Sequence, residues 1–284
     1  MINEYEDIAL FDSHTHLNNE DLTEGDVKGL IEAIEASQVE YVMNVGFDLP
    51  SSELALNQAE GLSWCYAAVG CHPHDAATMD EEKIKVFEKL AAHEKAKAIG
   101  EIGLDFHYDI SPRDVQEHWF RRQIQLANRL RMPIVIHSRD ADQLCMDILV
   151  SEGAFSDERK GWFPKRPSAA GGEEGDARVL LHCFSGSSEL AKEYVRLGGT
   201  ISMAGPVTYK NAKKNVRVVE ELPMEYLLVE TDAPYLTPVP HRGERNMSPY
   251  VIHTAEKVAE IKGLTLKEVA DATRENAKRF FNIR

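Results

Sequence analysis

Short apolar runs recur along the whole chain, and polar or helix-forming stretches separate them. The eight runs cover residues 8–11, 40–45, 64–69, 96–100, 133–136, 179–181, 199–203 and 226–229. Runs of this length, rich in β-branched residues and without polar alternation, are typical of parallel strands that are buried on both faces. Each run is therefore predicted to form one buried strand.

Between the runs, apolar residues recur at three- and four-residue spacing, which predicts amphipathic helices. The clearest pattern follows the fourth run and consists of Phe120, Ile124, Ala127 and Leu130. Ser111 is predicted to cap the start of this helix, because Pro112 after it suits the first helical position. Strands thus alternate with helices along the chain.

This alternation, in a chain of 284 residues, predicts an α/β fold of the (β/α)8 TIM-barrel type in a single domain spanning 1–284. A doubly wound open sheet is less favoured, because no glycine-rich phosphate loop follows the first strand. Segment 151–177, which contains several glycines and prolines, is predicted to be a flexible insertion. It should project from the end of the barrel opposite the strands' carboxyl ends, and a tolerated surface insertion is favoured over a contact with a partner.

The formal net charge is −15, from 47 acidic and 32 basic residues. This balance argues against bulk electrostatic binding to nucleic acid or to an anionic membrane, but it does not exclude an enzyme that binds phosphates locally. The four cysteines show no disulfide or CxxC pattern, which indicates free thiols in a reducing compartment. No signal peptide or membrane span is predicted. We therefore expect a cytoplasmic protein with no membrane association and no evident obligate protein partner.

Residues able to bind metal ions follow five of the runs. They are His14 and His16 after the first run, then Glu101, His137, His182 and Asp232. The carboxyl ends of the strands meet at one face of a parallel barrel, so these side chains should converge there. Imidazole and carboxylate ligands without thiolates suit Zn, Mn, Ni, Fe or Mg. The pattern predicts a metal-dependent hydrolase.

Single members of this set allow more than one interpretation. Residues two apart on a strand point the same way, so His14 and His16 both enter the barrel mouth. Glu101 would be a buried carboxylate that needs a partner, either in a salt bridge or between two metal ions. Asp232 could be a ligand and could also orient or deprotonate a metal-bound water.

Six stretches of the chain are similar to motifs of the TatD family of metal-dependent hydrolases and deoxyribonucleases, within the amidohydrolase-like barrels. The stretches are 11–16 (FDSHTH), 70–75 (GCHPHD), 100–105 (GEIGLD), 133–140 (PIVIHSRD), 181–186 (LHCFSG) and 230–234 (ETDAP). They occur in the family's order over nearly the whole chain. Two departures are Cys71 in place of the usual isoleucine and 242–249 (RGERNMSP) in place of Arg-Gly-Lys-Arg-Asn-Glu-Pro, with Glu244 replacing a basic residue.

The resemblance implies two divalent metal ions per chain, such as Mg, Mn or Zn. His14 and His16 would hold one ion and His137 and His182 the other, with Glu101 bridging them and Asp232 completing the first site. It also implies hydrolysis of phosphodiester bonds in DNA, often as a 3′–5′ exonuclease acting on single strands or 3′ ends. Roles in DNA repair and in DNA catabolism are both compatible with this activity.

The resulting hypothesis is that a hydroxide activated by two metals attacks phosphorus, with Asp232 and Glu101 as catalytic residues. Contacts to phosphate oxygens are predicted for His72, His74, Arg139, Arg242 and Arg245. Arginine suits this task because its planar fork can bind two oxygens at once. As alternatives, Arg139 could pair with a nearby aspartate, and the other two arginines could lie in a solvated loop.

Two other functions remain open. The same site could hydrolyse a carbonyl substrate, such as a cyclic amide, a lactone or an aminoacyl ester. A binding or scaffold protein with a vestigial site fits less well, because all six ligand positions hold residues competent to bind metal.

Overall fold

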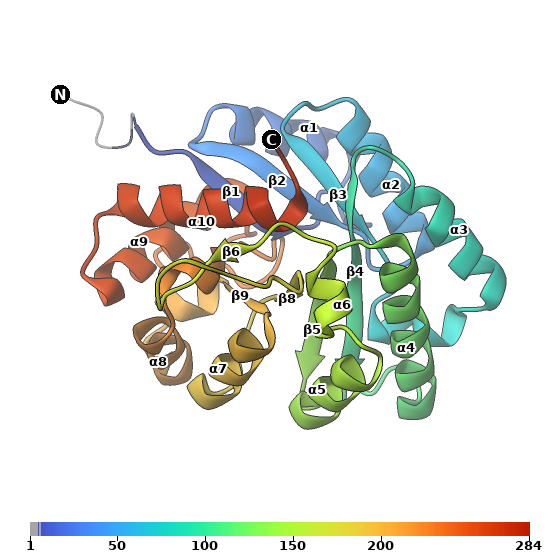
Figure 1. The fold of residues 1–284 in the computed structure, drawn as a ribbon. Helices are drawn as coiled ribbons and strands as arrows, with labels where there is room; N and C mark the ends of the chain where they lie inside the picture. The colour runs from blue at the N-terminus through green and yellow to red at the C-terminus, as the bar shows by residue number, and fades with distance from the viewer. Residues whose placement is uncertain (1–4, 6) are drawn as a thin grey trace.

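The computed structural model describes Tyr5 and residues 7–284. Its main sheet contains eight parallel strands in the order of the chain, with helices around the outside (Figure 1). The strands are β1 (Leu10–Thr15), β2 (Val39–Val45), β3 (Cys65–Val69), β4 (Ala96–Asp105), β5 (Ile134–Arg139), β8 (Val179–Leu181), β9 (Thr200–Met203) and β10 (Leu227–Val229). Each predicted run overlaps one of these strands. The sequential strand order confirms the predicted TIM barrel.

Helices fill the intervals between the strands and follow the last one. They are α1 (Glu24–Glu35), α2 (Leu49–Glu60), α3 (Glu81–Ala91), α4 (Arg113–Leu130), α5 (Asp142–Ser151), α6 (Asp157–Lys160), α7 (Ser188–Leu197), α8 (Lys213–Glu221), α9 (Val251–Lys262) and α10 (Leu266–Phe281). Short 3₁₀ helices are η1 (Pro73–Thr78), η2 (Gly205–Thr208), η3 (Met224–Tyr226) and η4 (Ser248–Tyr250). In the described part of the chain, no helix is both long and apolar enough to cross a membrane.

The strands are buried on both faces because all of them except β9 contribute side chains to both of two apolar clusters, one inside the barrel and one between the barrel and the helices. Phe11, Met43, Val135 and Leu180 point into the barrel, where Phe280 of α10 joins them. The alternate strand residues face outward and pack against the helices. This arrangement explains why the strands appear in the sequence as continuous apolar runs rather than as an alternating pattern.

The seam between β1 and β10 closes through a few backbone contacts. Thr15 and Ala233 form a parallel bridge, and the His16 amide donates a hydrogen bond to the Ala233 carbonyl over 2.8 Å. The Asp232 amide donates to the His14 carbonyl over 2.9 Å. Three predicted ligands, His14, His16 and Asp232, therefore lie in the two segments whose backbones close the barrel.

Segment 151–177 lies at the amino-terminal end of the strands, as its position between α5 and β8 predicts. Its composition predicts a flexible loop, whereas in the structure it forms α6 and a small antiparallel pair, β6 (Arg166–Pro167) and β7 (Glu173–Glu174). Arg159 and Arg166 are fully buried there. The Arg166 guanidinium donates to the carbonyl oxygens of Gly199 and Val195 at the entrance to β9.

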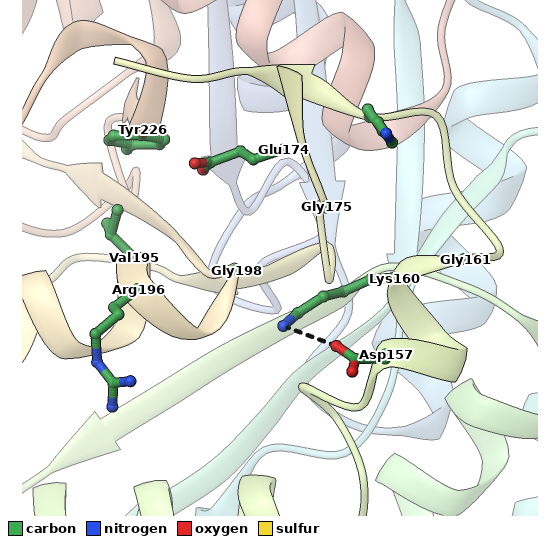
Figure 2. Close-up of a pocket in the computed structure, with 10 residues that line it drawn as sticks. Asp157, Lys160, Gly161, Glu174, Gly175, Val195, Arg196, Gly198 and Tyr226 are labelled. Carbon is green, nitrogen blue, oxygen red and sulfur yellow. Dashed lines mark ion pairs between the residues drawn. The ribbon is translucent and has the colours of Figure 1, made fainter. Parts of the chain in front are cut away.

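A pocket of about 580 Å³ lies at this same end of the molecule (Figure 2). Its lining comes from α6, β7, the end of α7 and Tyr226, with Lys160 paired to Asp157 over 3.7 Å. None of the predicted site residues lines it. The pocket is therefore separate from the predicted metal site.

The predicted N-cap at Ser111 is wrong. Helix α4 begins at Arg113 with Pro112 as its N-cap residue and with no side-chain cap. The Ser111 hydroxyl donates instead to the His74 carbonyl over 2.7 Å and accepts the Ala77 amide over 3.0 Å. Ser111 thus fixes the loop after β3, because tertiary partners satisfy its hydroxyl in place of the helix.

Candidate metal centre

The six predicted ligands meet at the carboxyl ends of their strands. His14 lies within β1 and His16 directly after it, while Glu101 and His137 lie on β4 and β5. His182 follows β8, and Asp232 follows β10 after two residues. His14, His16, Glu101 and His182 are buried, whereas His137 and Asp232 keep some exposure to the barrel mouth.

The first donor group consists of His14, His16, Glu101 and Asp232. The two Nε2 atoms of the histidines lie 3.3 Å apart. Glu101 Oε2 lies 3.4 Å from His14 Nε2 and 3.9 Å from His16 Nε2, and Asp232 Oδ1 lies 3.8 Å and 3.5 Å from the same two nitrogens. Ligand atoms about 2.0–2.2 Å from a tetrahedral zinc ion lie about 3.3–3.6 Å apart. The group therefore has nearly the spacing that a small divalent ion requires.

The second donor group surrounds the other oxygen of Glu101. His182 Nε2 lies 2.7 Å from Glu101 Oε1, and His137 Nδ1 lies 2.9 Å from it. His72 Nε2 is farther away, at 3.6 Å. Glu101 thus presents Oε2 to the first group and Oε1 to the second.

Protein acceptors hold the far ring nitrogen of three of these histidines. His16 Nδ1 lies 2.8 Å from the Val45 carbonyl, His137 Nε2 lies 3.0 Å from Asp105 Oδ2, and His182 Nδ1 lies 3.2 Å from Glu230 Oε1. Such partners fix the tautomer, so that the near nitrogen carries a free lone pair for a metal ion. The same pattern at three rings favours metal ligation over a simple hydrogen-bonded cluster.

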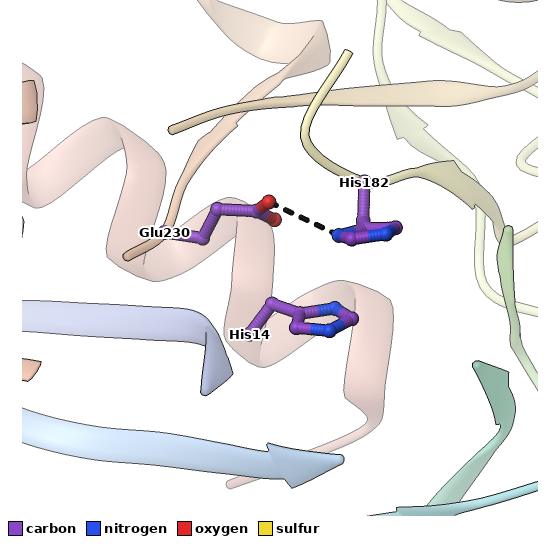
Figure 3. A group of neighbouring side chains, drawn as sticks. All are labelled: His14, His182 and Glu230. Carbon is purple, nitrogen blue, oxygen red and sulfur yellow. Dashed lines mark hydrogen bonds and ion pairs between the residues drawn. The ribbon is translucent and has the colours of Figure 1, made fainter. Parts of the chain in front are cut away.

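Figure 3 shows His14 and His182, one from each donor group, together with Glu230. The two imidazole rings stack with their centroids 3.9 Å apart. Within the described residues, His14 Nδ1 and Glu230 Oε2 are buried and have no hydrogen-bond partner. Unpaired buried polar atoms are costly, and they mark places where an ion or ordered water completes a protein site. Together with the nitrogen and oxygen donors, these atoms show that the residues fit divalent metal ions.

Electrostatics keep the central carboxylate ionised. Burial alone would raise the pKa of Glu101, but the imidazoles of His182 and His72 and the hydrogen bond from His137 hold that pKa well below its usual range. Burial likewise opposes ionisation of Asp232, while the hydrogen bond from His16 lowers its pKa. Both carboxylates are therefore available as anionic ligands.

Sequence reasoning missed Asp105, which supports the second donor group. Its Oδ2 faces His137 Nε2 and also His74 Nε2, the latter at 3.1 Å. Its Oδ1 accepts the backbone amides of His107 and Tyr108. The sequence could have predicted Asp105 only if the strand was expected to continue beyond Glu101, because residues 101, 103 and 105 then share one face of β4.

Gly103 lies between these two carboxylates and has a positive φ of 151°. A Cβ atom at this position would overlap with the His137 carbonyl oxygen. Glycine therefore allows β4 and β5 to approach closely, and this approach brings Glu101, Asp105 and His137 within hydrogen-bond distance.

Glu230 and Asp12 were also missed. Glu230 Oε1 accepts the Cys183 amide over 2.7 Å as well as facing His182. Asp12 accepts both the amide and the hydroxyl of Thr231, at 2.8 Å and 2.6 Å. These buried carboxylates hold the segments that carry His182 and Asp232 in place.

The five predicted substrate contacts differ in their distance from the metal centre. His72 and His74 lie at the metal centre, and the structure places their rings 4.3 Å apart. Arg139 is exposed and lies 4.7 Å over the Tyr108 ring, while Arg242 lies 4.0 Å over Tyr209. Arg245 instead pairs with Asp26 of α1 over 3.5 Å. The structure therefore brings the two histidines, but not Arg245, to the clustered donors.

Comparison with known proteins gives matches over almost the whole chain. A family model described as "TatD related DNase" matches residues 11–282. The uncharacterized metal-dependent hydrolase YabD of Bacillus subtilis is 46% identical over 274 residues, which cover 96% of this chain and 99% of YabD. The uncharacterized metal-dependent hydrolase TatD of Mycobacterium tuberculosis is 35% identical over 281 residues, which cover 96% of this chain and 98% of that protein.

The fold agrees with these matches. The crystal structure of YJJV, a TatD homolog from Escherichia coli k12, superimposes with a TM-score of 0.84 at 25% sequence identity. The superposition covers 97% of this chain and 98% of YJJV. The chain belongs to the TatD family of metal-dependent hydrolases.

Proposed function

We propose that this protein hydrolyses phosphodiester bonds of DNA with two divalent metal ions. The observation that carries the proposal is the position of Glu101, which turns one oxygen toward His14 and the other toward His182 and His137. A buried carboxylate shared between two nitrogen-rich groups suits a pair of ions. The family description "TatD related DNase" supports DNA as the substrate class.

In this proposal His14, His16 and Asp232 hold the first ion, His137 and His182 hold the second, and Glu101 binds both. Two such ions lower the pKa of a water molecule and stabilise charge on the attacking and leaving oxygens of a phosphoryl group. The protein contributes fixed positions, because the acceptors Val45, Asp105 and Glu230 hold the histidine rings.

Asp232 is the proposed proton acceptor. Its Oδ1 faces His14 and His16, so Oδ2 is left to take a proton from the attacking water. The Asp232 side chain is 14% exposed, compared with 5% for Glu101. Asp232 can therefore pass the proton to solvent, whereas Glu101 serves as a buried ligand.

His72 is proposed to bind substrate rather than metal. Its Nδ1 accepts the backbone amide of His74 over 3.1 Å, so this nitrogen carries no proton. A neutral His72 then carries its proton on Nε2, which lies near Glu101 and faces the centre. A protonated nitrogen donates a hydrogen bond and offers no lone pair, so His72 suits a phosphate oxygen.

Arg139 and Arg242 are proposed to hold neighbouring phosphates, because both guanidinium groups are exposed and stack on tyrosine rings. His74, whose Nε2 faces Asp105, would lie beside the same phosphate as His72. Arg245 could join them only by leaving Asp26, and an exposed pair of this kind contributes only about 0–1 kcal/mol. The 3′–5′ exonuclease polarity that the family resemblance implies is part of the same proposal.

The test begins with protein stripped by a chelator and then supplied with Mg, Mn or Zn separately. Single-stranded DNA labelled at the 3′ end reports exonuclease polarity through early release of labelled mononucleotide, and a 5′-labelled strand serves as its counterpart. We expect metal-dependent cleavage that is lost in Glu101→Ala and Asp232→Ala. Glu193→Ala, an exposed residue paired with Arg196, is the matched control and should cleave like the unmodified protein.

Absence of cleavage with every metal, in protein that still binds metal, would contradict the proposal. The carbonyl alternative would then be tested on panels of lactones, cyclic amides and aminoacyl esters with the same variants.

A further inference from the structure

Large apolar side chains are exposed mainly around the mouth of the barrel. Of the exposed large hydrophobic residues among those described, Tyr108 and Ile110 lie between β4 and α4, and Tyr235, Leu236 and Val239 lie between β10 and η4. The remaining ones, Leu54, Val150 and Leu264, are scattered singly over other helices and turns. Exposed apolar groups that gather at one place mark a binding surface.

The two groups lie on opposite sides of the metal centre. In the barrel β4 and β10 are separated by β1, β2 and β3 on one side and by β5, β8 and β9 on the other. Their loops therefore face each other across the mouth, with Glu101 and Asp232 between them. A ligand that reaches the metal centre has one of these loops on either side.

A tyrosine in each loop is held in place by residues of the site. The Tyr108 ring meets the His74 ring edge to face at 5.5 Å and lies beneath Arg139. The Tyr235 hydroxyl accepts a hydrogen bond from Asn19 over 3.0 Å, and its ring lies 6.3 Å from that of His16. Despite these contacts Tyr108 is 56% exposed and Tyr235 is 52% exposed.

We propose that Tyr108 and Tyr235 are stacking platforms for two unpaired nucleobases, one on each side of the phosphodiester bond that is cleaved. Aromatic side chains bind bases in this way irrespective of sequence, because every base has a flat face. The inference rests on the function proposed above and specifies its substrate as nucleic acid that is single-stranded on both sides of the cleaved bond. Paired bases would be stacked on their neighbours and could not contact either ring.

The charges beside the rings favour a nucleic acid over an apolar peptide or a second copy of this chain. Arg139 lies on Tyr108, and Arg242 lies on Tyr209, which donates a hydrogen bond to the Thr237 carbonyl in the loop that carries Tyr235. Each aromatic group is thus accompanied by an exposed cation. Flat bases joined by anionic phosphates match this pairing of rings and cations.

The test measures KM for a single-stranded oligonucleotide in Tyr108→Ala, Tyr235→Ala and the corresponding phenylalanine variants. We expect each alanine variant to raise KM at least about fivefold, the lower end for loss of one stacked base, and each phenylalanine variant to restore binding. Leu54→Ala and Leu264→Ala, which remove exposed apolar groups elsewhere, are the controls. An oligonucleotide with abasic nucleotides on both sides of the cleaved bond should erase the difference between alanine variants and controls.

A second readout does not depend on catalysis. Chelator-stripped protein should quench the fluorescence of 2-aminopurine placed next to the cleaved bond, and each alanine variant should quench it less. If the protein cleaves DNA but the tyrosine variants behave like Leu54→Ala in both assays, this inference is wrong and the proposed function stands. If the unmodified protein cleaves no oligonucleotide with any metal, the proposed function fails and this inference fails with it.

Discussion

A single carboxylate, Asp105, controls the geometry of two histidines. One oxygen of Asp105 faces both His137 and His74, at 3.0 Å and 3.1 Å. We predict that Asp105→Asn lowers metal affinity about 10- to 100-fold, the usual effect of removing a carboxylate behind a metal-binding histidine. Isothermal titration calorimetry of the stripped variant with Zn or Mn measures this directly.

Asp140→Asn is the matched control for this prediction. Asp140 is exposed, and its Oδ2 lies 3.1 Å from Nδ1 of His107, another histidine of the same region. Its loss should change metal affinity less than twofold. Equal affinities in the two variants would contradict the role assigned to Asp105.

The predicted ligands were visible in the sequence because a metal-binding residue at the end of an apolar run has a defined position in a barrel. The carboxylates that hold the rings of these ligands could not be predicted in the same way. Asp105 lies five positions beyond the predicted run 96–100, and Glu230 lies two positions before the more conspicuous Asp232. The contact between Arg245 and Asp26 could not be predicted either, because it joins a loop to helix α1, more than 200 residues away in the chain.

Among the elements, segment 151–177 is fixed to the barrel by two buried arginines, of which Arg159 makes the contacts of α6. The Arg159 guanidinium donates to the carbonyl oxygens of Ala177 and Met132 and to the side chain of Asn128. We predict that Arg159→Ala lowers the free energy of unfolding by about 3 kcal/mol or more, because several buried acceptors lose their donor at once. Urea unfolding followed by circular dichroism measures the change.

Lys165→Ala, in the same segment but on the surface, should change the free energy of unfolding by less than about 0.5 kcal/mol. The metal affinity of folded Arg159→Ala should equal that of the unmodified protein, since Arg159 lies at the opposite end of the barrel. A small stability change in Arg159→Ala would show that α6 is not fixed by these hydrogen bonds.

The strands could be predicted because they are continuous apolar runs, and most helices because their apolar residues recur at three- and four-residue spacing. The two short strands β6 and β7 could not be predicted, because they contain only two residues each and no apolar run marks them. Their pairing is held by Arg166, which contacts Glu174 within the segment and the backbone before β9 outside it. Tertiary contacts of this kind override local propensity and leave no periodic signal in the sequence.

For the whole molecule, metal binding should add stability. A ligand present at 100 times its dissociation constant contributes about 2.7 kcal/mol when it binds only the folded state, and each kcal/mol raises Tm by roughly 2–4 °C in chains of this size class. We therefore predict that chelation lowers Tm by at least about 5 °C. Differential scanning calorimetry with and without added Mn or Zn checks this.

In Glu101→Gln, the Tm should differ much less between protein with and without metal, because the substitution weakens both donor groups together. Glu193→Gln, an exposed residue on α7, should keep it. An identical Tm with and without metal in the unmodified protein would show that the clustered donors do not bind the ions tested.

The seam between β1 and β10 has a consequence for how the protein is made. The hydrogen bonds that close the seam join the backbone of His14 and His16 to that of Asp232 and Ala233. The two histidines can form these bonds only after residues more than 200 positions later in the chain have been synthesised. A nascent chain cannot assemble the first donor group until translation has passed residue 233. The first donor group therefore forms only after the residues that follow β10 have been synthesised, and a chain released from the ribosome before that point lacks Asp232 and the backbone contacts that close the barrel.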